Sequence, residues 1–132
     1  DLFFPLNPTI NIFTGDNHIN NKKKLIEDIL PRAFINFNKL IDKFEGNFFL
    51  GERSYYCDYN VFHHLSLALL IDENILNNYP KLNKFMSDFE SQNGIKEYLD
   101  SRPQLVGIGT KPKVIIDGKE YATGTNPDYN YK

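Results

Sequence analysis

The chain has 132 residues, of which 41% are hydrophobic and 24% charged, and its formal net charge is −2. This length and composition predict one globular domain with a core of its own. The small negative charge favours no nucleic-acid partner, and the run Lys22–Lys24 reads as a solvated helix face. A single cysteine excludes an internal disulfide and fits a reducing, cytoplasmic compartment. We expect no membrane segment and no signal peptide, because the apolar runs are too short.

The first half of the chain predicts a loop followed by two helices. Residues 5–20 are rich in Pro, Gly and Asn, which is typical of a loop. From residue 22 to about residue 45, apolar residues recur at steps of one, three or four and predict a long helix that ends at Gly46. Pro31 should kink this helix or divide it into two segments. A second helix, Tyr55–Ile71, is apolar enough to be central in the fold.

The sequence of the second half predicts two further helices and, near the end, a change from a helical to a strand-like pattern. Tyr79-Pro80 begins an amphipathic helix, which Asn93-Gly94 is expected to cap. A short helical piece at Ile95–Leu99 should end before Pro103, because a proline disfavours the helical conformation in the preceding residue. Val114–Tyr121 contains an Asp-Gly pair typical of a tight turn, which predicts a small β-hairpin. A loosely ordered tail is the equal alternative.

The start of the second helix has an unusual composition, GERSYYCDYN over residues 51–60. The first N–H groups of a buried helix need partners, since no water reaches them. An aspartate three residues after the N-cap can accept from the backbone of the cap residue and interacts favourably with the helix dipole. Asp58 has this spacing from Tyr55, although Ser54 is chemically the better N-cap. We therefore predict a structural helix cap formed by Ser54, Tyr55 and Asp58, and no catalytic acid.

This stretch resembles the helix-start motif in the C-terminal domain of cytosolic glutathione transferases. There a glycine turn leads into a pattern T-x-A-D followed by apolar residues. Leu50-Gly51 matches the start, Cys57 takes the small alanine position, Asp58 matches the aspartate, and Val61-Phe62 matches the apolar pair. Tyr55 departs from the pattern, because the family has Thr or Ser at that position.

The resemblance continues on both sides of the motif. Ile29-Leu30-Pro31 looks like the proline-bearing helix of the same domain. Tyr79–Leu82 looks like its aromatic-Pro-x-Leu segment, and Ile95–Pro103 looks like its last helix. The matches cover residues 22–103 in the family's order and spacing. The segment 105–132 is longer than most members carry there.

The resemblance implies an all-α fold, a helical bundle of the glutathione transferase C-terminal domain type. We expect residues 1–104 to form this domain and residues 105–132 a C-terminal extension. The family also has a thioredoxin-like N-terminal domain that binds glutathione and activates its thiol, and nothing in this chain reads as that unit. We therefore expect the chain, which opens at Asp1 without a methionine, to be the C-terminal portion of a longer protein.

By resemblance, the full-length parent conjugates glutathione, its co-substrate, to hydrophobic electrophiles without a prosthetic group. The fragment alone is expected to be inactive and to supply a substrate wall and contacts of a homodimer. The alternative is a non-catalytic interaction or structural module with the same fold. A thioredoxin-like segment upstream of residue 1 would discriminate between the two.

The resemblance also implies roles for individual residues, none of them catalytic. Asp1 resembles an aspartate that can reach glutathione in the neighbouring subunit, and a plain carboxylate at a helix end is the alternative. The apolar wall for the second substrate is expected at Leu6, Ile10, Leu105 and Val106. No metal site is expected, because the adjacent His63 and His64 point in different directions on a helix. Cys57 is expected to be a small buried residue, not a redox nucleophile.

Overall fold

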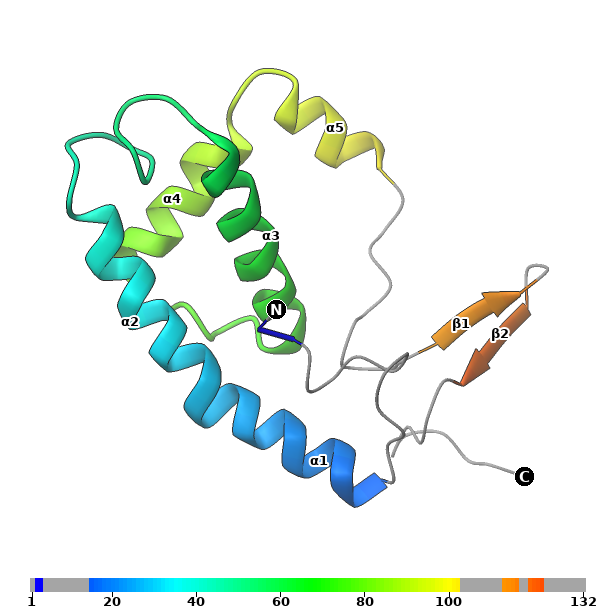
Figure 1. The fold of residues 1–132 in the computed structure, drawn as a ribbon. Coiled ribbons are helices and arrows are strands. Elements are labelled where there is room, and N and C mark those ends of the chain that lie inside the picture. The colour runs from blue at the N-terminus through cyan, green and yellow to red at the C-terminus, as the bar shows by residue number, and fades with distance from the viewer. Residues whose placement is uncertain (1, 4–14, 103–112, 117–118, 123–132) are drawn as a thin grey trace. The chain divides into compact units, whose positions relative to one another are not determined.

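The computed structural model describes residues 2–3, 15–102, 113–116 and 119–122 (Figure 1). Along the chain the elements are α1 (Gly15–Lys24), the π-helical turn η2 (Leu25–Ile29), α2 (Leu30–Ile41), α3 (Tyr56–Ile71), α4 (Pro80–Glu90), α5 (Ile95–Ser101), β1 (Lys113–Ile116) and β2 (Lys119–Ala122). The chain divides into two compact units, one of residues 31–104 and one of residues 1–30 with 105–132.

The first helical stretch is longer at its start and shorter at its end than the sequence predicts. It begins at Gly15, so the predicted loop is wrong over residues 15–20. An aspartate in the first turn of a helix interacts favourably with the helix dipole. Asp16 has this position, which helps a segment of loop-like composition to form a helix. The stretch ends at Ile41, four residues before the predicted end, and Gly46 lies in the following loop.

Pro31 marks a change of helix type and does not end the helix. It is the second residue of α2 and directly follows η2 and Leu30. The N–H of Leu30 donates to the carbonyl of Leu25, five residues earlier, as in a π-turn. Proline removes one N–H donor and crowds the carbonyl four residues earlier. A π-turn adds one residue just before this position, so the helix continues with a local change in its hydrogen bonding.

The loop between α2 and α3 contributes two buried phenylalanines to the core. Gly46 has φ +134° and Gly51 has φ +116°, backbone conformations that other residues rarely adopt. Between them, Phe48 and Gly51 exchange two backbone hydrogen bonds, of 3.0 and 3.2 Å. This tight turn leaves Leu50 at its tip half exposed, while Phe48 and Phe49 are buried.

The core of residues 31–104 is an aromatic cluster. The ring of Phe49 meets Phe85 of α4 edge to face with centroids 5.1 Å apart, and Phe62 of α3 stacks on Phe89 of α4 at 4.5 Å. Aromatic pairs in these geometries add to the stabilisation that burial of their area provides. α3 buries Phe62, Leu65, Leu67 and Ala68 in this unit, whereas its residues Tyr56, Tyr59 and Leu70 are exposed.

The helix ends in the second half follow the sequence with one correction. Pro80 is the first residue of α4 and Tyr79 its N-cap, as predicted. The C-cap of α4 is Ser91, so Gly94 does not end α4. Gly94 is the N-cap of α5 with φ +80°, and its N–H donates to the carboxylate of Glu97 at 2.5 Å. The loop Gln92–Gly94 therefore joins two helices directly.

The predicted β-hairpin is present as two antiparallel strands, β1 and β2. Their register pairs Lys113 with Ala122 and Ile116 with Lys119. The two residues between the strands, 117 and 118, lie outside the described residues. In the described part of the unit formed by residues 1–30 and 105–132, Phe3, Leu25 and Leu30 are buried.

Candidate functional site

The carboxylate of Asp58 holds the start of α3 and the loop before it. Its side chain is completely buried. Oδ2 accepts the backbone N–H of Tyr55, the N-cap, at 2.8 Å, and Oδ1 accepts the backbone N–H of Phe49 at 2.9 Å. The thiol of Cys57 donates weakly to Oδ2 at 3.6 Å. One buried charge thus joins the helix to a loop segment nine residues earlier, and these bonds compensate for its loss of water.

The three residues of the predicted cap have different roles in the structure. Tyr55 is the N-cap, but its side chain makes no capping bond, so the capping box is one-sided and depends on Asp58. Ser54 does not cap α3. Its hydroxyl donates to Oε1 of Gln92, 38 residues later, at 2.6 Å. Ser54 therefore connects the start of α3 to the loop after α4.

Cys57 is poorly suited to act as a nucleophile. Burial, and then the negative charge of Asp58, raise the pKa of its thiol above the ordinary value of a cysteine. A thiol needs its thiolate form to react, and a raised pKa reduces that form at neutral pH. This environment agrees with the expectation of a non-reactive residue, but Cys57 is only partly buried and not the fully buried residue that the sequence predicts.

The two adjacent histidines have different surroundings. His64 Nδ1 lies 2.8 Å from the backbone carbonyl of Asn60, so Nδ1 carries the proton of this hydrogen bond. Partial burial, and then His64 and Arg102, lower the pKa of His63. Among the residues described, no group of three or more His, Cys, Asp or Glu side chains is arranged to hold a metal ion.

The residues that the resemblance places near the substrates lie outside the described residues. These are Asp1 for glutathione, and Leu6, Ile10, Leu105 and Val106 for the apolar substrate. Their predicted roles stay predictions. The same is true of the division into a domain of residues 1–104 and an extension of residues 105–132.

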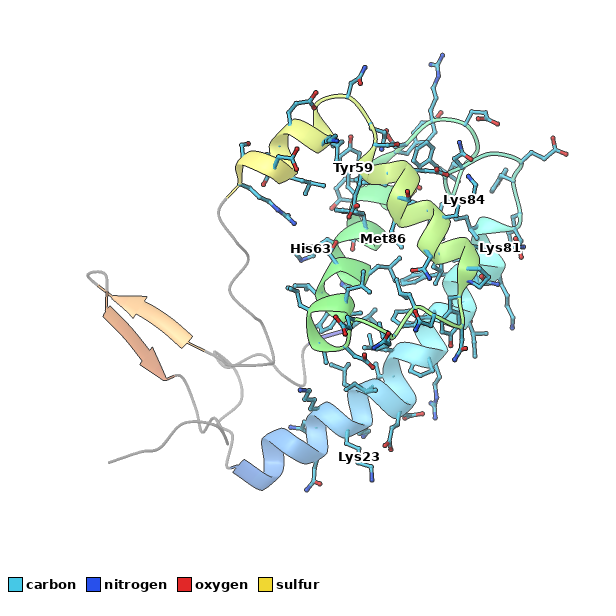
Figure 2. The ribbon with its side chains drawn as sticks, turned by 180° about the vertical axis from the view of Figure 1, so that it is seen from behind. Lys23, Tyr59, His63, Lys81, Lys84 and Met86 are labelled. Atoms are coloured by element: carbon cyan, nitrogen blue, oxygen red, sulfur yellow. The ribbon has the colours of Figure 1, made fainter. Side chains whose placement is uncertain are left out.

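Two surface grooves in residues 31–104 were not predicted from the sequence. The larger groove has a volume of about 440 Å³ and lies between α4 and α5. The smaller, of about 240 Å³, lies between the loop after α2 and α4, beside the ion pair of Lys81 and Asp42. In Figure 2, Lys81 and Lys84 lie on the side of α4 away from the buried Met86. Grooves depend on how helices pack, and no local pattern in the sequence indicates them.

Comparison with known proteins assigns the chain to a family. The family model described as "Glutathione S-transferase, C-terminal domain" matches residues 6–102. The chain belongs to this family. The match covers all the segments that carry the resemblance except Pro103, and the helical fold agrees with the all-α class predicted from the sequence.

Relatives of this glutathione S-transferase domain come from several organisms. It is 29% identical over 106 residues to "Glutathione S-transferase P" of Caenorhabditis elegans, a match that covers 79% of the chain and 49% of that protein. It is 30% identical over 100 residues to "Putative glutathione S-transferase alpha-3" of Dictyostelium discoideum, a match that covers 71% of the chain and 47% of that protein. A third relative, "Glutathione S-transferase 2" of Onchocerca volvulus, is 31% identical over 83 residues. This match covers 61% of the chain and 40% of that protein.

The glutathione S-transferase domain spans about half the length, or less, of the curated relatives it matches. No solved structure gives a significant match to it. Within the part of the chain that the structure describes, no helix is both long and apolar enough to cross a bilayer.

Proposed function

We propose that this domain acts in a glutathione S-transferase that conjugates glutathione to hydrophobic electrophiles. The family match over residues 6–102, together with a helical bundle of the matching class, is the observation that carries this proposal. The relatives whose names say glutathione S-transferase support it, and none of them favours a non-catalytic module. The proposed protein uses glutathione as co-substrate, contains no prosthetic group, and works as a homodimer in the cytoplasm.

In this proposal the helical domain does not activate the thiol. Within the described residues the one cysteine, Cys57, has a raised pKa and is tied to a structural carboxylate. A partner domain of the thioredoxin-like type would bind glutathione and stabilise its thiolate. The helical domain would contribute part of the apolar pocket for the second substrate.

The proposed reaction is a nucleophilic addition or substitution by sulfur. The glutathione thiolate donates an electron pair to an electrophilic carbon and forms a C–S bond. In a substitution the leaving group departs with its bonding pair. In an addition the resulting carbanion takes a proton from water or from an acid in the site.

The pocket for the electrophile is proposed to include Leu6, Ile10, Leu105 and Val106. Apolar walls of this kind bind by area and shape, without a fixed hydrogen-bond pattern. Replacing Leu6 or Leu105 by alanine should therefore raise KM for an apolar electrophile while KM for glutathione stays unchanged. If Asp1 reaches glutathione across a dimer, Asp1→Ala should raise KM for glutathione and leave KM for the electrophile unchanged.

The test is steady-state kinetics of the protein that carries both domains, with glutathione and a chromogenic aryl halide. We expect KM for the aryl halide to rise about tenfold in the leucine variants, since each lost apolar contact weakens binding of the reacting molecule. Leu50→Ala is the matched control, because Leu50 is half exposed at a loop tip, and its KM should not change. If the folded two-domain protein neither binds nor conjugates glutathione, the proposed enzymatic function is refuted. The alternative, a non-catalytic interaction or structural module, then remains.

A further inference from the structure

The groove between α4 and α5 is lined by charges of both signs. α4 contributes one carboxylate and two hydroxyls, and α5 with its C-cap contributes two cations and one carboxylate: Glu90, Ser87 and Ser91, and Lys96, Arg102 and Asp100. Within the described residues, none of these four charged side chains makes an ion pair or a side-chain hydrogen bond. Glu90, Lys96 and Asp100 are exposed and Arg102 is half-buried, so the groove holds two positive and two negative groups that face solvent and that no described side chain neutralises.

Two Lys-to-Asp pairs of equal spacing differ in whether they form an ion pair. Lys84 and Asp88 of α4 stand four residues apart in the order Lys then Asp, and they form an ion pair. Lys96 and Asp100 of α5 have the same order and spacing, and they do not. Residues four apart on a helix are neighbours, so both pairs can close. Of these two pairs, Lys84 and Asp88 form an ion pair, and Lys96 and Asp100, which line the larger groove, do not.

The smaller groove provides the contrast. Its two lysines, Lys81 and Lys84, are each bonded to an acidic side chain, Asp42 and Asp88 respectively. Lys84 also donates to Asn47 at 2.8 Å. Its positive charges are already compensated, which leaves little to attract a ligand.

We propose that the groove between α4 and α5 binds a small zwitterion of the amino-acid or short-peptide class. The ligand's carboxylate bonds Arg102 and Lys96, and its ammonium group bonds Glu90 and Asp100. A volume of about 440 Å³ is in the range of small-molecule sites and accommodates a short peptide. Charge-assisted bonds at both ends of the ligand would fix its direction in the groove.

The hydroxyl of Ser91 fits the same role. It donates to the backbone carbonyl of Asp88 at 2.9 Å, so its oxygen lone pairs remain able to accept from an ammonium group. Ser91 directly follows Glu90, so these two residues provide acceptors at the end of α4. The groove is formed by other residues than those proposed for glutathione and the electrophile, and its test does not require transferase activity.

The test is a titration of the ¹⁵N-labelled chain with glycylglycine, followed by amide chemical shifts. Glycylglycine carries both charges and no thiol, which separates this test from the conjugation reaction. We expect saturable shifts at residues of α4 and α5. N-acetylglycine, with only the carboxylate, and glycinamide, with only the ammonium group, should each bind at least about tenfold more weakly, since each lacks one set of charged bonds.

Charge-removing variants complete the test. Arg102→Gln and Glu90→Gln should each weaken glycylglycine binding about tenfold. Lys81→Gln, in the smaller groove, is the control and should leave binding unchanged. The proposal is overturned if glycylglycine gives no saturable shifts, if N-acetylglycine binds equally well, or if Glu90→Gln has no effect on a variant with wild-type amide dispersion.

Discussion

Replacement of Asp58 by alanine removes the carboxylate that joins the start of α3 to the loop before it. Two backbone N–H groups lose their acceptor, that of Phe49 and that of Tyr55. The bond to Phe49 is buried, so its N–H stays unpaired and costs about 1–3 kcal/mol. The N–H of Tyr55 is partly buried, and water can replace its partner at a cost of about 0.5–1 kcal/mol.

The sum predicts that Asp58→Ala lowers the free energy of unfolding by about 1.5–4 kcal/mol. The Cys57 thiol adds little, because its bond at 3.6 Å is long and its donor weak. The assay is urea unfolding followed by far-UV circular dichroism at 222 nm. With a slope of about 2 kcal/mol/M, the midpoint should fall by about 1–2 M.

Asp72→Ala is the matched control at the other end of α3. Asp72 accepts the N–H of Asn74 at 2.9 Å in an exposed position, so its removal should cost about 0.5 kcal/mol or less. A midpoint for Asp58→Ala that equals that of Asp72→Ala would refute the reasoning. It would show that the buried N–H groups find other partners.

Two further changes test the loops and the thiol. Gly46→Ala should destabilise the fold by about 2–4 kcal/mol, because φ is +134° and the new Cβ would lie 2.3 Å from the Gly51 carbonyl carbon. Gly94→Ala, with φ +80° and open space, should cost only about 1–2 kcal/mol in the same urea assay, and equal costs would contradict this account. Alkylation of Cys57 by iodoacetamide should require a higher pH than alkylation of free cysteine, because its pKa is raised. Asp58→Asn should move the rate profile to lower pH by removing a negative charge, whereas an unchanged profile would exclude that cause.

Local patterns in the sequence determined most of the helices. Apolar spacing predicted α2, α3 and α4, since a period of 3.6 residues is a property of each segment by itself. Proline at the start of α4 acts locally in the same way, because it fixes the backbone over one or two positions. The ordered set of motifs also indicated the family, which the match over residues 6–102 confirms.

Tertiary structure decided which groups meet across the fold. The sequence predicts that Asp58 reaches Tyr55, three residues away, but gives no sign of its bond to Phe49 in the preceding loop. It also favours Ser54 as a cap, whereas packing brings Gln92 to the hydroxyl. Side-chain hydrogen bonds between distant segments depend on the arrangement of whole helices, which local periodicity does not specify.

The clearest case is the two Lys-to-Asp pairs of equal spacing. In sequence, Lys84 with Asp88 and Lys96 with Asp100 are equivalent, and helix geometry allows both to close. The structure closes the first and leaves the second open beside the groove between α4 and α5. An exposed ion pair gains so little free energy in water that the local surroundings decide whether it forms. Those surroundings are set by the packing of α4 against α5, which only the tertiary structure contains.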